Sequence, residues 1–138
     1  MSEPVDLEPL KKALNDVVAP WVRELGLQLE SASPGEARLT LPVSAPLVHG
    51  GGVLCGQAMM AASDTAMVLA LITQFGEFRP CTTVQLSSSF LKPLSGQDAL
   101  VQARVIRAGK SLAFGEIDIR GATDDKSACR ATTTYALL

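Results

Sequence analysis

Asp64 is the residue of this sequence that most strongly suggests chemistry. It is the only charged residue between Gly50 and Gly76, in a segment rich in Ala, Met and Leu. An ionised carboxylate in apolar surroundings is costly unless water or hydrogen-bond donors reach it. The ordinary interpretation is a buried Asp that bonds nearby backbone or faces a partner subunit. The sharper interpretation is a general base or a nucleophile whose reactivity is tuned by its surroundings.

The start of the same apolar segment offers hydrogen-bond donors. Cys55, Gly56 and Gln57 stand where a helix is expected to begin, and the first N–H groups of a helix have no partner within it. Those donors and the helix dipole suit an anionic ligand or a developing oxyanion. Taken alone, the same residues also fit an ordinary junction between loop and helix.

Two other pairs of residues carry weaker signals. His49, the only histidine, lies six residues before Cys55 and could form a dyad with it as nucleophile, although a small cysteine more often fills packing space. Arg107 and Lys110 flank an expected turn and could bind phosphate groups. A solvated hairpin is the ordinary alternative for that pair.

Hydrophobic spacing predicts the elements that would hold these residues. Residues 7–25 have the period of an amphipathic helix, which Pro20 should bend or end and Gly26 should stop. After this helix the period changes to two, as in half-buried strands. The two strands of the predicted hairpin are 27–31 and 37–41.

A loop over residues 42–52 leads into the apolar segment, which we expect to be a helix from about Leu54 to Phe75. Because it is apolar on nearly every face, it should be buried all round. Short turns separate four further strands and predict an antiparallel meander: 83–91, 99–106, 112–120 and 128–137. This order predicts one α+β domain over residues 1–138, with about six antiparallel strands curled around one central helix.

Composition restricts the class of protein. The chain has 138 residues, 47% of them hydrophobic and 19% charged, with a formal net charge of −2. The length fits one domain. The mild acidity and the scattered Lys and Arg residues argue against nucleic-acid binding, which needs a basic field. One Trp and one Tyr likewise argue against a base-stacking platform.

The cysteines indicate where the protein works. Cys55, Cys81 and Cys129 are irregularly spaced with no CxxC pair, and with a single histidine no metal site is expected. Free thiols indicate a reducing compartment. The first six residues lack the basic and apolar regions of a signal peptide. The most apolar stretch, 58–72, is too short to span a bilayer, so we expect a cytoplasmic protein without a membrane partner.

Three groups of residues form motifs: Gly56 with Asp64, Thr83 with Phe90-Leu91-Lys92-Pro93, and Ala108-Gly109-Lys110-Ser111-Leu112-Ala113. Together they resemble a known family, the hot-dog-fold acyl-CoA thioesterases of the phenylacetate-degradation (PaaI-like) type. The resemblance covers about residues 35–137. It implies a hot-dog fold, in which the sheet wraps around the central helix, and thioester hydrolysis with no cofactor, since coenzyme A is part of the substrate.

The family pattern is Asn-x-x-Gly-x-x-His-Gly-Gly with an acid nine residues after the His. Counting back from Asp64, the named positions of that pattern fall in order on His49, Gly52, Cys55, Gly56 and Gln57. This register keeps Gly52, Gly56 and Asp64 without a gap. Starting instead from the His of His49-Gly50-Gly51 puts Ala58 where the acid belongs.

The resemblance implies a role for each matched position. The N–H of Gly56 would polarise the thioester carbonyl, and Asp64 would activate water or attack directly. Thr83 would help to hold the water, and His49, in place of the family's Asn, would be a side-chain donor near the carbonyl. Further contacts to the substrate would come from Cys55, Gln57, Arg107 and Lys110.

The spacing of Gly56 and Asp64 indicates an oligomer. Eight helical residues span about 12 Å at about 1.5 Å per residue, so one thioester carbon cannot contact both in one chain. Two antiparallel helices at a dimer interface would bring Gly56 of one chain near Asp64 of the other and create two equivalent sites. We therefore expect a homodimer as the minimum unit, and such dimers could pair into tetramers.

Three activities remain open from the sequence. The leading one is hydrolysis of an acyl-CoA by carboxylate-assisted attack of water. The replacement of the family's His and Asn by Cys55 and His49 motivates a second one, binding of an acyl thioester without turnover. The third is a hydratase on the same fold, which would pair His49 with an acid.

Overall fold

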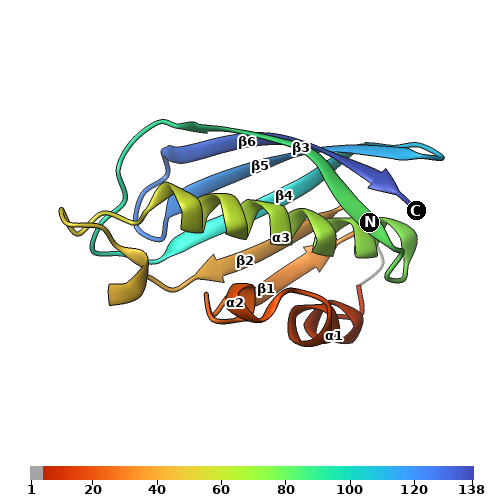
Figure 1. Ribbon diagram of the computed structural model, residues 1–138, viewed down its shortest axis with the longest axis horizontal. Helices are drawn as coiled ribbons and strands as arrows, with labels where there is room; N and C mark the ends of the chain where they lie inside the picture. The colour runs from red at the N-terminus through yellow and green to blue at the C-terminus, as the bar shows by residue number, and fades with distance from the viewer. Residues whose placement is uncertain (1–4) are drawn as a thin grey trace.

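Residues 5–138 are described by a computed structural model, in which one antiparallel sheet wraps around one long helix (Figure 1). The six strands are hydrogen-bonded in the order β1-β2-β4-β5-β6-β3. Their bounds are β1 Gln28–Ser33, β2 Glu36–Leu41, β3 Cys81–Phe90, β4 Ala99–Ala108, β5 Leu112–Gly121 and β6 Ser127–Leu137. The predicted α+β architecture, with six strands around a central helix, is confirmed. The signal-peptide argument falls largely on residues 1–4, outside the described residues.

The position of β3 differs from the predicted meander. Only β4, β5 and β6 form a meander, whereas β3 pairs with β6, in a register that runs from Cys81 opposite Leu137 to Phe90 opposite Cys129. The segment 91–98 has the residues of a tight turn, but it carries the chain to β4, on the far side of β5 and β6. Within this segment, Leu94 is fully buried, and the Leu94 carbonyl accepts the N–H of Leu54 at 2.8 Å. Since β3 stands last in the strand order, next to β6, it is an edge strand.

The N-terminal segment forms two helices instead of the single one predicted. α1 covers Glu8–Asp16 and packs against the central helix, and α2 covers Pro20–Arg23. Ala19 is extended, with ψ at 149°, because a residue that precedes proline disfavours the helical conformation. Pro20 therefore begins a helix where we expected it to bend or end one.

The central helix α3 covers Gly56–Phe75 and ends at Gly76, which takes the left-handed conformation. Most of its residues are buried against the inner face of the sheet. Burial all round was wrong for one stripe, whose members recur at helical spacing and stay at least partly exposed: Gln57, Met60, Ala61, Asp64 and Val68. We call these five residues the open stripe. Asp64 therefore lies on the one face of α3 that solvent or a partner can reach.

α3 is the one helix among residues 5–138 that is long and apolar enough to cross a membrane by length and composition. At 20 residues it exceeds the 58–72 stretch on which the sequence argument about length relied. Most of the helix is buried within the domain, which is typical of a core helix and not of a membrane span. α3 is the core of the domain.

Candidate functional site

The Asp64 carboxylate lies between α3 and the strand pair β3–β6. Thr83 on β3 donates its hydroxyl to Asp64 Oδ1 at 2.8 Å, and Tyr135 on β6 donates its phenol to the same oxygen at 2.6 Å. Thr83 and Tyr135 stand opposite each other in the register of the two strands. Both donors therefore reach Asp64 from neighbouring points of the sheet, and Thr83, expected to hold the water, contacts the carboxylate itself.

Tyr135 is a site residue that the sequence analysis missed. Its side chain is 2% exposed, and its phenol also lies 2.9 Å from the backbone carbonyl oxygen of Asp64. A buried phenol needs a hydrogen-bond partner. The sequence did contain one signal for Tyr135. It is the single Tyr of the chain, and it alternates with Thr133 and Leu137 on the inward-facing side of the last strand.

Asp64 has no cation within ion-pair distance among residues 5–138, which sets it apart from the charged pairs on the surface. Within the described part of the chain, the hydroxyls of Thr83 and Tyr135 donate to it. The effect on its neighbours is visible: burial raises the pKa of the Cys81 thiol, and the charge of Asp64 raises that pKa further. Burial and then the contact with Asp64 also raise the pKa of the Tyr135 phenol. Tyr135 therefore stays a neutral donor at physiological pH.

Gly56 is the first residue of α3 and precedes Gln57, the first member of the open stripe. The N-cap residue, Cys55, makes no side-chain cap hydrogen bond, so the first N–H groups of the helix lack this usual acceptor. A Cβ at Gly56 would lie 3.1 Å from the ring of Phe90, the last residue of β3. Glycine thus lets the aromatic ring cover the start of the helix, beside the N–H that the resemblance assigns to the substrate carbonyl.

The loop before α3 holds the remaining predicted residues of this region. The N–H of His49 donates to the Val53 carbonyl at 3.0 Å, and the N–H of Cys55 donates to the Leu47 carbonyl at 2.9 Å. His49 is exposed, Cys55 is half-buried, and within residues 5–138 no hydrogen bond joins their side chains. Gln57 is exposed on the open stripe. The backbone thus gathers these residues at the start of α3, and a Cys–His dyad has no contact to support it.

Arg107 and Lys110 lie far from Gly56 in the same chain. Arg107 lies near the end of β4 and Lys110 lies in the turn between β4 and β5, where its carbonyl accepts a hydrogen bond from the guanidinium of Arg79 at 3.2 Å. Arg79 also lies over the ring of Phe75, the last residue of α3, at 5.3 Å from the ring centroid. The structure therefore adds a third cation, Arg79, to the two that the sequence singled out, all near the C-terminal end of α3.

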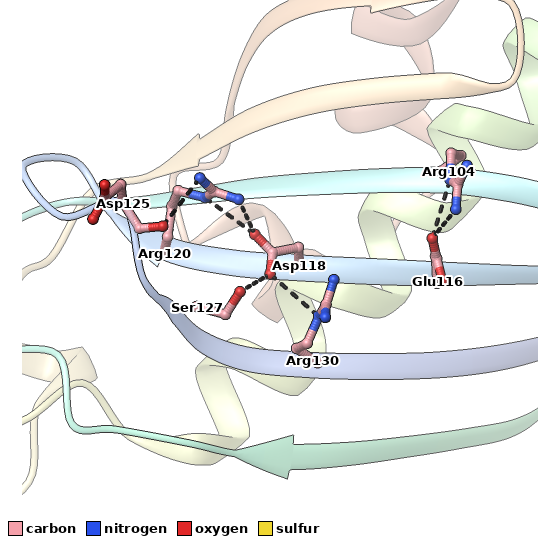
Figure 2. A network of polar contacts seen from close by, with 7 residues as sticks. All are labelled: Arg104, Glu116, Asp118, Arg120, Asp125, Ser127 and Arg130. Atoms are coloured by element: carbon pink, nitrogen blue, oxygen red, sulfur yellow. Dashed lines mark hydrogen bonds and ion pairs between the residues drawn. The ribbon is translucent and has the colours of Figure 1, made fainter.

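The outer face of the sheet carries a different polar cluster, shown in Figure 2. A shallow groove of about 480 Å³ crosses this face and is lined by side chains of β3, β4, β5 and β6. Its cations are already paired: Arg120 contacts Asp118 at 2.8 Å, Arg130 contacts the same carboxylate at 3.6 Å, and Arg104 pairs with Glu116. Asp118 is therefore neutralised where Asp64 is not, and the groove is not the candidate site.

Comparison with proteins of similar sequence shows the family of this chain. The sequence profile of the thioesterase superfamily matches residues 48–128, a range that contains Gly56, Asp64 and Thr83. Acyl-coenzyme A thioesterase 13 of Homo sapiens is 30% identical over 100 residues, which cover 70% of this chain and 70% of that protein. The chain belongs to the thioesterase superfamily.

Solved structures confirm the hot-dog fold. Thioesterase HI1161 of Haemophilus influenzae superposes with a TM-score of 0.85 at 22% identity, covering 99% of this chain and 93% of that one. PaaI of the phenylacetic acid degradation operon of Escherichia coli superposes with a TM-score of 0.83 at 20% identity, covering 95% and 91%. The resemblance drawn from the sequence motifs is thereby confirmed.

The electrostatic coupling between Asp64 and Cys81 predicts a change in thiol reactivity. In Asp64→Asn the pKa of Cys81 should fall, because its anionic neighbour is removed. At pH 8 more thiolate is then present, and alkylation of Cys81 by iodoacetamide, followed by peptide mass spectrometry, should accelerate about two- to fivefold. Cys129 is the matched control, because its pKa is raised by burial and by Asp118. An unchanged Cys81 rate, or an equal rise at Cys129, would contradict the coupling.

Proposed function

We propose that this chain hydrolyses an acyl-CoA thioester to a free acid and CoA by carboxylate-assisted attack of water, without a metal. The observation that carries the proposal is the Asp64 carboxylate, accessible on the open stripe and held by two neutral hydroxyls. A carboxylate whose charge no neighbouring cation compensates can accept a proton from water. Membership of the thioesterase superfamily supports a thioester as the substrate.

The proposed site is completed by a second copy of the chain. Gly56 and Asp64 lie about 12 Å apart along α3, at about 1.5 Å per residue, too far for both to act on one carbonyl.

The edge strand β3 borders the open stripe and, with the residue after it, exposes apolar side chains: Val84 is 59% exposed, Phe90 49% and Leu91 56%. An apolar edge strand favours pairing with another chain. An antiparallel homodimer through this edge would bring Gly56 of the partner subunit to Asp64; pairs of dimers could assemble further into tetramers.

The chemistry then follows from the donors and acceptors. Asp64 takes a proton from water while the water oxygen bonds to the thioester carbon, and the carbonyl π electrons move to its oxygen, beside the N–H of Gly56. When the tetrahedral intermediate collapses, the C–S bond breaks and the thiolate of CoA takes the proton back from Asp64. The products are the free acid and CoA, and the Asp64 carboxylate is restored.

The phosphates of CoA are assigned to the turn between β4 and β5. Arg107 precedes this turn, Lys110 lies in it and Arg79 is hydrogen-bonded to it, so three cations lie within one short region. Guanidinium and ammonium groups are the usual partners of phosphate. The thioester group of the substrate is assigned to the start of α3. There Gly56 has Cys55, Gln57 and His49 as neighbours, and His49 would donate to the thioester carbonyl.

We place this activity in the cytoplasm, because three free cysteines suit a reducing compartment. Binding of an acyl-CoA without turnover is the alternative, and it is favoured by one observation. The exposed His49, which stands where the family has Asn, has no side-chain hydrogen bond to any of residues 5–138. Tight binding without hydrolysis of any acyl-CoA would favour this alternative.

Asp64→Asn tests the proposed base. The amide has nearly the shape of the carboxylate but cannot accept the proton of water, so kcat should fall by about 10²- to 10⁴-fold. Release of CoA from a panel of acyl-CoA thioesters, followed with a thiol-trapping dye, measures the loss. Asp16→Asn is the control, because Asp16 is an exposed carboxylate at the end of α1. Full activity of Asp64→Asn across the panel would remove Asp64 from the mechanism.

Gly56→Pro tests the proposed carbonyl donor, because proline has no N–H. Proline is favoured at the first position of a helix, and Cys55 already has the extended conformation that a residue before proline needs, with φ at −71° and ψ at 149°. We expect kcat/KM to fall by about 10²- to 10³-fold. Gly56→Ala is the matched control, since it makes the same close approach to Phe90 but keeps the N–H. Equal losses in the two variants would assign the effect to Phe90.

A further inference from the structure

We propose that Tyr135 is a positioning residue which, with Thr83, fixes Asp64 through Oδ1 and leaves Oδ2 as the oxygen that takes the proton from water. The inference rests on the proposed hydrolysis, and it names a residue that the family pattern above does not contain. It also changes the role of Thr83, which the resemblance assigns to holding the water.

The two donors converge on one oxygen. Tyr135 lies 2.6 Å and Thr83 lies 2.8 Å from Asp64 Oδ1. The phenol has a single proton, and its oxygen is closer to this carboxylate oxygen than to the Asp64 carbonyl oxygen, at 2.9 Å. Within residues 5–138, neither hydroxyl bonds Oδ2. The two carboxylate oxygens are therefore unequal before any substrate arrives.

This inequality matters because an aspartate carboxylate turns easily. Its terminal torsion is broad and roughly two-fold, so a free carboxylate would exchange its two oxygens. Two donors on Oδ1 oppose that rotation and hold Oδ2 in one direction. A base held in one orientation loses less entropy on reaching the geometry for proton transfer.

The backbone explains why the two donors meet. Thr83 and Tyr135 are partners in the β3–β6 register, and the register shifts between Thr83 and Gln85, which makes Val84 an extra residue in β3. Such bulges turn a side chain and occur next to active sites. Tyr135 is almost fully buried beneath α3, so its phenol has little freedom to leave. The donors thus come from rigid strands and not from a loop.

A spectroscopic test uses the fact that the chain has one tyrosine. Replacement of the tyrosine by 2,3,5-trifluorotyrosine through amber suppression labels Tyr135 alone, and the three fluorines make its phenol acidic enough to titrate at moderate pH. Its ¹⁹F resonances should titrate about one pH unit lower in Asp64→Asn than in the wild-type chain, because the anionic acceptor is lost. Cys81 is the other titratable group that faces this pair, and Cys81→Ser should leave the difference in place. Equal titration midpoints in wild type and Asp64→Asn would overturn the proposed contact.

A kinetic test separates positioning from packing. Tyr135→Phe removes only the hydroxyl, and we expect kcat to fall about tenfold with KM changed less than about twofold. Thr133→Val is the matched control, since Thr133 is also buried on β6 and donates to the Gln85 carbonyl at 2.9 Å without touching Asp64. It should keep kcat within about twofold of wild type. An unchanged kcat in Tyr135→Phe, or an equal loss in Thr133→Val, would contradict the positioning role.

The two tests distinguish failure of the proposed hydrolysis from failure of the positioning role. If the ¹⁹F midpoints differ but the wild-type chain hydrolyses no thioester, the contact stands and the proposed hydrolysis falls. If Asp64→Asn is inactive but Tyr135→Phe is fully active, the hydrolysis stands and the positioning role falls. Should Tyr135→Phe fail to fold by circular dichroism, the ¹⁹F comparison still decides, because it keeps the phenol in place.

Discussion

The structure depends on how an apolar helix accommodates one carboxylate. Asp64 has no cation within ion-pair distance in the described part of the chain, so its charge relies on hydroxyl donors and on access from the open stripe. Those donors exist because β3 crosses to the edge of the sheet and pairs with β6, which sets Thr83 beside Tyr135. The crossing that makes the fold differ from a simple meander is therefore also what builds the site. Asp118, neutralised by Arg120 and Arg130 on the outer face, shows what a structural carboxylate looks like in the same chain.

The second constraint is the length of the helix between donor and base. The N–H of Gly56 and the Asp64 carboxylate lie on the same helix but about two turns apart, and no motion within a rigid helix brings them together. Val84, Phe90 and Leu91 expose apolar surface next to that stripe, on the edge strand. The proposed dimer satisfies both conditions at once, because it covers the apolar edge and supplies the missing half of each site.

Sequence reasoning identified Asp64 and Gly56, because a lone charge and a glycine stand out in a segment of Ala, Met and Leu. It identified Thr83 only through the resemblance to a family. It missed Tyr135, which lies 71 residues from Asp64, because strand pairing across that distance depends on which edge β3 occupies. The sequence did not indicate which edge β3 occupies, because segment 91–98 has the residues of a local turn. Likewise, residue spacing alone could not show that the sheet leaves one stripe of α3 uncovered.

The measurement that most directly tests the shared site is complementation between two defective subunits. Asp64→Asn and Gly56→Pro chains, each inactive alone, are mixed, unfolded and refolded together, and the thioesterase activity of the mixture is compared with that of wild type treated in the same way. If each site takes its base from one chain and its N–H donor from the other, a mixed dimer holds one intact site. Statistical mixing then restores about a quarter of the wild-type activity. If the mixture stays inactive although mixed dimers form, base and donor act within one chain and the account is wrong.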